Sequence, residues 1–242
     1  MVAVNSHVVY PIARDISSYQ PDLLIVYLGH NEVVGPYGPG TVLASFTTDL
    51  KMIRVVLFAK STRIGQALDK LLRHFLYGQN ASKGWGGMPM FLENQVRSDD
   101  PRIERMLEHY QANLEDILGV GIEAGAGVLL CTLASNLKDC PPFASMHRAD
   151  LTDEQKAEWE KVYQFGNEQE KAGNYAEAVR SYRQAAEIDG HFADLWFRLG
   201  RCHQALKELA VALKCYRQAR ELDTLRFRAD SRINQIVREI AG

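Results

Sequence analysis

The sequence has no long apolar run, no excess of charge and few cysteines, and each of these absences excludes a class of protein. No apolar run in the 242 residues approaches the roughly 18 residues of a membrane-spanning helix. The 28 basic and 30 acidic residues leave a net charge of -2, which excludes the basic footprint typical of nucleic-acid binders. Residues 1–16 contain no basic segment followed by an apolar stretch, so they do not predict a signal peptide, and the compartment stays unknown.

The cysteines also lack the spacing of a metal site. Cys131, Cys140, Cys202 and Cys215 form no CxxC pair, and such pairs are typical of zinc sites. We therefore expect four ordinary thiols, and neither a metal nor a cofactor.

What the sequence does contain is an internal repeat of 34 residues. When the chain is shifted by that length, Tyr182–Ala185 coincides with Tyr216–Ala219. The other coincident residues are Gly166 with Gly200, Ala178 with Ala212, Glu187 with Glu221, and Asp189 with Asp223. Small residues at this spacing let the two helices of a hairpin cross closely, and we expect the tyrosines to fill the space between hairpins.

Local signals predict where these helices begin and end. Thr152 and Gln155 have the spacing of a capping box, and Gly173 predicts a helix end. The period and the coincident residues resemble the tetratricopeptide family, with repeats at 159–192 and 193–226.

The array departs from that family at the end of each repeat and is extended by one helix. Gly190 and Thr224 stand where the family often has proline. A further apolar segment at 225–240 predicts a helix that caps the stack. Such arrays usually bind peptides, but two repeats form little groove, so the alternative is that the pair only packs on its neighbouring domain.

Residues 1–150 predict an α/β domain, and residues 151–242 predict the separate all-α array. The runs at 22–28 and 128–133 are continuously apolar, as in parallel strands that are buried on both faces. Helices are expected at 9–18 and twice within 42–78, with a break near Ser61.

A longer helix is expected after Asp100 and Pro101, which have the pattern of an N-cap and first turn. It ends near Gly125, directly before the second strand. Its apolar face consists of Ile103, Met106, Leu107, Tyr110, Leu114, Ile117 and Leu118.

Two strands are few for such a domain, because a sheet usually has about five or six. We therefore expect that strands precede Met1 and follow Gly242. The expected fold is a partial three-layer αβα, flavodoxin-like sheet, followed by the helical-hairpin array.

The first predicted strand leads into a motif with a known counterpart. Residues 21–32 read Pro-Asp-Leu-Leu-Ile-Val-Tyr-Leu-Gly-His-Asn-Glu. This segment resembles the third conserved block of the SGNH (GDSL-like) hydrolases, an apolar strand that ends in Gly-x-Asn-Asp or Gly-x-Asn-Glu. The resemblance implies that the Asn31 carboxamide donates to the oxyanion of ester hydrolysis and that Gly29 permits a tight turn. The alternative is an asparagine that binds its own backbone in a turn.

The remaining parts of that family's site are not recognisable. The chain contains no Gly-Asp-Ser, no Gly-x-Ser-x-Gly, and no histidine with an aspartate three residues before it. The family's second block would lie just before Met1. His147, in a loop with acidic neighbours, is the candidate substitute base, and His30, Glu32, Tyr37 and Asn136 are candidate pocket residues.

The sequence therefore leaves three functions open. The first is a fragment of a serine ester hydrolase for acyl or acetyl esters, with an embedded tetratricopeptide pair and no activity as given. The second is a non-enzymatic interaction module that binds a peptide or protein on its repeats. The third is a complete α/β protein with an unfamiliar site, for example one that uses His147.

Overall fold

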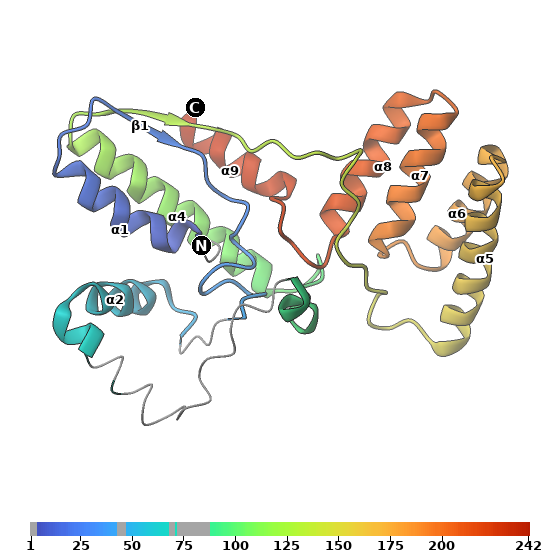
Figure 1. Cartoon of the computed structure of the whole chain (residues 1–242), viewed down its shortest axis with the longest axis horizontal. Coiled ribbons are helices and arrows are strands. Elements are labelled where there is room, and N and C mark those ends of the chain that lie inside the picture. Colours follow the sequence, from blue (N-terminus) through green and yellow to red (C-terminus); the bar gives the residue numbers. More distant parts are fainter. Residues whose placement is uncertain (1–3, 43–46, 68–70, 72–87) are drawn as a thin grey trace. The chain divides into compact units, whose positions relative to one another are not determined.

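The computed structural model describes residues 4–42, 47–67, 71 and 88–242, which form two compact units (Figure 1). The first unit comprises Met1–Asn94, Pro101–Leu133 and Ser231–Gly242, and the second comprises Gln95–Asp100 and Ala134–Asp230. The second unit is therefore inserted in the sequence of the first. No helix in the described ranges combines the length and the apolar character that crossing a membrane requires.

The first unit contains a two-stranded parallel sheet with helices packed on it. β1 (Leu23–Val26) pairs with β2 (Gly127–Leu130) in parallel, with Ile25 opposite Leu129. The central helix α4 (Arg102–Glu123) packs on β2, on α1 (Ser6–Ser17) and on α9 (Ser231–Ala241). The unit also contains α2 (Leu50–Ser61), which packs on α1, and the 3-10 helix η2 (Met88–Asn94).

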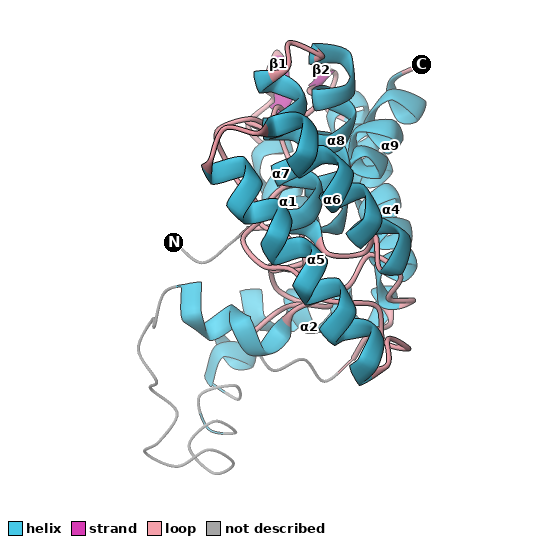
Figure 2. Cartoon of the chain, turned by 90° about the vertical axis from the view of Figure 1, so that its right-hand side faces the viewer, coloured by secondary structure: helices cyan, strands magenta, loops and turns pink. Residues whose placement is uncertain are grey.

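Both strands were predicted correctly, but the prediction that they are buried on both faces is wrong. Exposed and half-buried residues alternate along each strand, and Ile25 is 64% and Leu129 51% exposed. The physical reason is that the described helices cover one face of the sheet. Helices predominate in the described residues, and the two strands are short (Figure 2). The partial three-layer αβα arrangement that the sequence predicts is therefore not shown.

The helices of the first unit follow the predicted apolar patterns. α1 begins three residues earlier than predicted, at Ser6, and α2 ends at the predicted break, Ser61. The second helix predicted within 42–78 lies largely outside the described residues. α4 buries Ile103, Met106, Leu107, Tyr110, Leu114 and Ile117 as predicted, whereas Leu118 is only half-buried. Its N-cap residue is Pro101 and not Asp100.

The second unit consists of two helical hairpins, as the 34-residue period predicts. α5 (Asp153–Lys171) packs on α6 (Tyr175–Ile188), and α7 (Ala193–Ala205) packs on α8 (Leu209–Leu222). Contacts between α6 and α7 join the hairpins. The capping box of Thr152 and Gln155 forms, with both reciprocal hydrogen bonds present.

A glycine and a tyrosine close each hairpin. A Cβ atom at Gly166 would lie 2.6 Å from Tyr182 Cε1, and one at Gly200 would lie 2.6 Å from Tyr216 Cδ1. Each ring therefore packs on the backbone of its own hairpin. Tyr182 also belongs to the core cluster that includes Leu195 and Leu199 of α7, so it fills space between the hairpins as expected. Because no side chain fits beneath either ring, the repeated glycines are required by packing.

The predicted C-terminal helix forms but differs in its position. The sequence places it at 225–240 as a cap on the repeats, whereas α9 begins at Ser231 and groups with the first unit. Its buried residues Ile233, Ile236 and Val237 form the apolar face, and α9 packs on α4.

The turn inside each hairpin provides a matched stability test. Gly173 has φ of +79°, and Lys207, which lies 34 residues later, has φ of +65°. A left-handed conformation costs an L-residue about 1 kcal/mol or more relative to glycine. We expect Lys207→Gly to raise the free energy of unfolding by about 0.5–1 kcal/mol and Gly173→Ala to lower it by about 1 kcal/mol, measured by urea denaturation. A loss of stability in Lys207→Gly would contradict this account of the turn.

Candidate functional site

Two buried aspartates occupy equivalent positions in the repeats. Asp189 is the C-cap residue of α6, and Asp223 is the C-cap residue of α8. Each is only 2% exposed, although a buried carboxylate is costly unless hydrogen bonds compensate it. Their hydrogen-bond partners therefore show what these positions do.

Both aspartates bind the same preceding segment of chain. Asp223 accepts hydrogen bonds from the backbone N–H groups of Phe143 (3.0 Å) and Ala144 (3.2 Å). Asp189 accepts one from Arg148 N (3.3 Å) and lies 2.7 Å from His147 Nδ1. The segment 143–148 thus crosses the ends of both hairpins, with one aspartate at each end of it.

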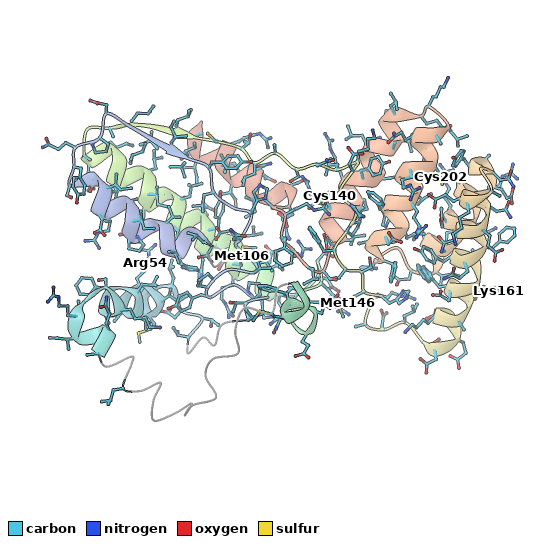
Figure 3. The ribbon with its side chains drawn as sticks, viewed as in Figure 1. Arg54, Met106, Cys140, Met146, Lys161 and Cys202 are labelled. Atoms are coloured by element: carbon cyan, nitrogen blue, oxygen red, sulfur yellow. The ribbon has the colours of Figure 1, made fainter. Side chains whose placement is uncertain are left out.

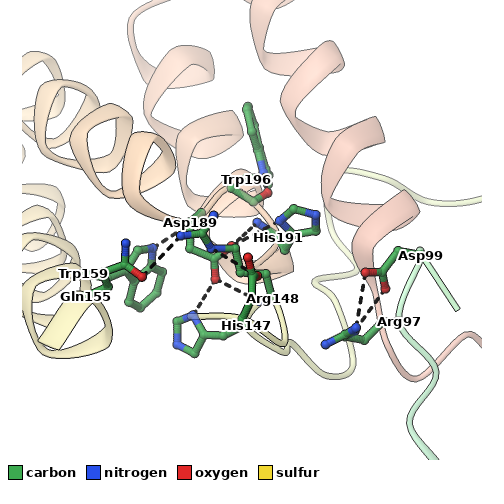
Figure 4. A network of polar contacts seen from close by, with 11 residues as sticks. Arg97, Asp99, His147, Arg148, Gln155, Trp159, Asp189, His191 and Trp196 are labelled. Atoms are coloured by element: carbon green, nitrogen blue, oxygen red, sulfur yellow. Dashed lines mark hydrogen bonds and ion pairs between the residues drawn. The ribbon is translucent and has the colours of Figure 1, made fainter. Parts of the chain in front are cut away.

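The environment of His147 is that of a packed anchor (Figure 4). Its ring meets the Trp159 ring edge-on, with centroids 4.6 Å apart, and its Nδ1 faces Asp189. Trp159 Nε1 in turn donates to the Asp189 backbone oxygen at 3.1 Å. These contacts fix the loop to the first hairpin, and the role of His147 as a substitute base stays a prediction.

Arg228 extends this attachment toward the N-terminal part of the loop. Its guanidinium donates to Asp223 Oδ2 (3.1 Å) and to the backbone oxygens of Cys140 (2.7 Å) and Pro141 (3.3 Å). Asn136, a predicted pocket residue, accepts from Asp139 N at 2.9 Å and so shapes the turn that carries Lys138 and Asp139.

The same type of position produces opposite pKa shifts. Burial alone would raise the pKa of Asp189, but hydrogen bonds from His191 N, His147 and Arg148 N outweigh it, so that this pKa lies below its ordinary value. Burial raises the pKa of Asp223 above its ordinary value, and its bonds from Phe143 N, Ala144 N and Arg228 offset burial only in part.

The loop and the second hairpin together line an open surface pocket of about 460 Å³. The side chains of Phe197 and Tyr216, both nearly buried, provide apolar surface. Lys138 and Arg201, with side chains 60% and 57% exposed, provide positive charge. The lining residues are Lys138, Asp139, Phe197, Arg201, Gln204, Ala205 and Tyr216.

In the first unit, the motif after β1 forms a tight, well-anchored turn. Gly29 has φ of +142°, and a Cβ atom there would lie 2.6 Å from Ile233 Cγ2. The Asn31 side chain donates through Nδ2 to the backbone oxygen of Val4 at 3.0 Å. The His30 ring lies edge-on to Tyr27, with centroids 6.1 Å apart. The oxyanion role of Asn31 stays a prediction.

Glu32 belongs to a buried polar cluster that sequence reasoning missed. Its carboxyl group accepts hydrogen bonds from Ser6 N (2.9 Å) and Ser6 Oγ (2.7 Å). Burial raises the pKa of Glu32 to about 7, although the hydrogen bonds from Ser6 oppose this shift. Asn113 Nδ2 donates to Ser6 Oγ (3.0 Å) and also lies 3.1 Å from His7 Nδ1.

Arg54 fixes the orientation of this cluster. It extends from α2 (Figure 3), donates through Nη2 to Asn113 Oδ1 at 3.1 Å, and pairs with Asp116 at 2.6 Å. Because the Asn113 oxygen accepts from Arg54, its amide nitrogen faces His7. His7 Nδ1 is then the acceptor, which leaves the proton of the neutral ring on Nε2.

The candidate site residues therefore divide between the units. Gly29, His30, Asn31, Glu32 and Tyr37 belong to the first unit, whereas Asn136 and His147 belong to the second. Within the first unit, the Tyr37 ring lies edge-on to His7, with centroids 5.7 Å apart. One sequence signal for the missed cluster was Asn113, a polar residue on the apolar face of α4 between Tyr110 and Leu114.

Comparison with known proteins identifies one part of the chain. Residues 170–230, which include α6, α7 and α8, match the family model of the tetratricopeptide repeat and support that resemblance for this part of the chain. No curated protein and no solved structure matches the chain. No comparison supports the resemblance of residues 21–32 to SGNH hydrolases.

The two aspartates predict opposite pH trends. The lowered pKa of Asp189 means that its contribution to stability is present above its unfolded pKa of about 4 and is lost as the pH falls through the folded value. The raised pKa of Asp223 means that its contribution is present at low pH and is lost as the pH rises through the folded value.

We therefore expect Asp189→Asn to cost about 2 kcal/mol of unfolding free energy at pH 7 and much less below about pH 4. The cost of Asp223→Asn should change with pH in the opposite direction. Urea denaturation of the wild type and both variants at several pH values from 7 to below 4 measures the two losses of unfolding free energy. Each variant serves as the control for the other. Two costs that change in parallel with pH would be incompatible with the opposite shifts.

Proposed function

We propose that the protein is an interaction module that binds a protein partner on the helical hairpins of its second unit. The observation that carries this proposal is the match of residues 170–230 to the tetratricopeptide repeat. Stacked repeats of this kind present extended surfaces that bind other chains. The glycine–tyrosine packing in both hairpins supports a rigid surface of that type.

The pocket between α7, α8 and the loop carrying Lys138 is the proposed binding surface. Its apolar side chains, Phe197 and Tyr216, suit a buried side chain of a peptide. Its exposed cations, Lys138 and Arg201, suit a carboxylate. Two acidic residues reduce the positive charge, because Asp139 lies 3.8 Å from Lys138 and Glu170 lies 3.2 Å from Arg201. The proposed ligand is therefore a peptide segment with an apolar side chain beside an acidic group.

A peptide library displayed against the full chain tests this proposal. We expect selected peptides to combine an apolar and an acidic residue. We also expect them to bind at least tenfold more weakly to the variant Lys138→Glu with Arg201→Gln, because the paired carboxylate loses its partners. Fluorescence anisotropy of a labelled selected peptide gives the dissociation constant.

The matched control is Arg183→Gln, which neutralises an exposed arginine on α6 outside the pocket. Its affinity should equal that of the wild type. The proposal fails if no peptide binds the folded chain, or if the control weakens binding as much as the pocket variant does.

We also propose a second candidate function, in which the chain supplies the oxyanion donor of an ester hydrolase through Asn31 but is inactive by itself. The observation that favours it is the position of Asn31 in the turn that follows a parallel strand, where α/β proteins bind ligands. The absence of Gly-Asp-Ser and Asp-x-x-His from the sequence weighs against activity of this chain by itself.

We therefore expect the chain not to hydrolyse a chromogenic acetyl ester above the buffer rate. Turnover that is lost in Asn31→Ala would establish the oxyanion role and contradict the expected inactivity. Turnover that is lost in His147→Ala would instead support an unfamiliar site that uses this histidine as its base.

A further inference from the structure

A second pocket, of about 170 Å³, lies in the first unit. Its lining includes His7 from α1, Tyr37 from the loop after β1, and Thr48 from the segment before α2. The other polar groups come from the first turns of α4, where Met106 marks the position in Figure 3. These polar groups are Arg102, Arg105 and His109.

The positive charge of this pocket comes from its two arginines. Two guanidinium groups and two imidazole rings line it, and its described lining contains no carboxylate. The carboxylates of Glu108 and Asp49 raise the pKa of His109, whereas the arginines Arg105 and Arg54 lower it. Burial lowers the pKa of His7 to about 4, so this ring is neutral and offers an N–H donor without charge. The set still matches an anion, because the guanidinium groups supply N–H bonds together with positive charge and the neutral imidazole adds a further N–H donor.

Each arginine donates to a neutral oxygen at the pocket. Arg105 Nη1 donates to Thr48 Oγ1, and Arg102 Nη1 donates to Pro39 O, both at 3.2 Å. The His7 ring is fixed by Asn113, so its free donor is Nε2–H. The rings of His7 and His109 meet edge-on, with centroids 5.4 Å apart.

The depth and volume of the pocket limit the ligand. His7 and Met106 are 5% and 7% exposed and form the floor, whereas both arginines are exposed at the rim. A volume of 170 Å³ corresponds to roughly six water molecules at about 30 Å³ each. It is below the roughly 300 Å³ at which pockets for drug-sized ligands begin.

We propose that this pocket binds a compact phosphoryl oxyanion, either inorganic phosphate or the phosphate of a small monoester. Arg102 and Arg105 bind its oxygens at the rim, and His7 and His109 donate to it from within. The arginine side chains favour a phosphate over a single carboxylate, because a phosphate offers enough oxygens for several N–H groups at once. The α4 N-terminus adds a favourable dipole.

Isothermal titration of the full chain with inorganic phosphate, glycerol phosphate and acetate at constant ionic strength tests the proposal. We expect saturable binding of at least one phosphate compound and at least tenfold weaker binding of acetate. The first two ligands distinguish free phosphate from a monoester. Arg105→Gln should weaken phosphate binding at least tenfold, whereas Arg14→Gln, which neutralises an exposed arginine elsewhere on α1, should leave it unchanged.

A second readout follows the histidine rings by nuclear magnetic resonance. Burial and Arg105 lower the pKa of His109, so a bound anion should raise this pKa in the wild type and not in Arg105→Gln. Three results would overturn the proposal. Phosphate does not bind saturably, or acetate binds as tightly as phosphate, or Arg14→Gln weakens phosphate binding as much as Arg105→Gln does.

Discussion

The second unit depends on two buried aspartates that bind backbone N–H groups of one segment. Asp189 and Asp223 end the two hairpins, and the 34-residue period places them at equivalent positions. A buried carboxylate must be compensated, and here the amides of Phe143, Ala144 and Arg148 do so together with the side chains of His147 and Arg228. These bonds stabilise the hairpins and also fix the loop. The repeat thus places two buried carboxylates at equivalent positions, and N–H groups of the preceding loop donate to both.

This attachment also builds the proposed binding surface. The loop fixed by Asp223 and Arg228 includes the turn that carries Lys138 and Asp139, and these two residues line the pocket with Phe197, Arg201 and Tyr216. The ends of the hairpins are occupied by the chain's own loop. A partner therefore meets a surface made jointly by helices and loop, with apolar and charged groups in fixed positions.

The sequence predicted those features that depend on local periodicity. The 34-residue coincidence of Gly166 with Gly200 predicted two hairpins, and the apolar face of α4 followed from its spacing. It failed where a feature depends on distant residues. Continuous apolar strands suggested burial on both faces, whereas the exposure of Ile25 depends on which helices cover the sheet.

The polar clusters were missed for the same reason. Ser6 meets Glu32 and Asn113 across 26 and 107 residues of sequence, and no local pattern records such contacts. The sequence shows that Asp189 and Asp223 lie 34 residues apart at equivalent positions. It does not show that both bind the loop before the repeats, because that contact depends on the folded chain. The contacts of His147 with Asp189 and Trp159 likewise join residues that are distant in the sequence.

Hydrogen exchange of individual backbone amides tests the central interaction most directly. If Asp189 and Asp223 hold the loop, the amides of Phe143, Ala144 and Arg148 are protected in the wild type although they lie outside any helix. Asp223→Ala should then release the first two amides and leave Arg148 protected. Exchange of all three in the wild type at the rate of an unstructured peptide would contradict the account.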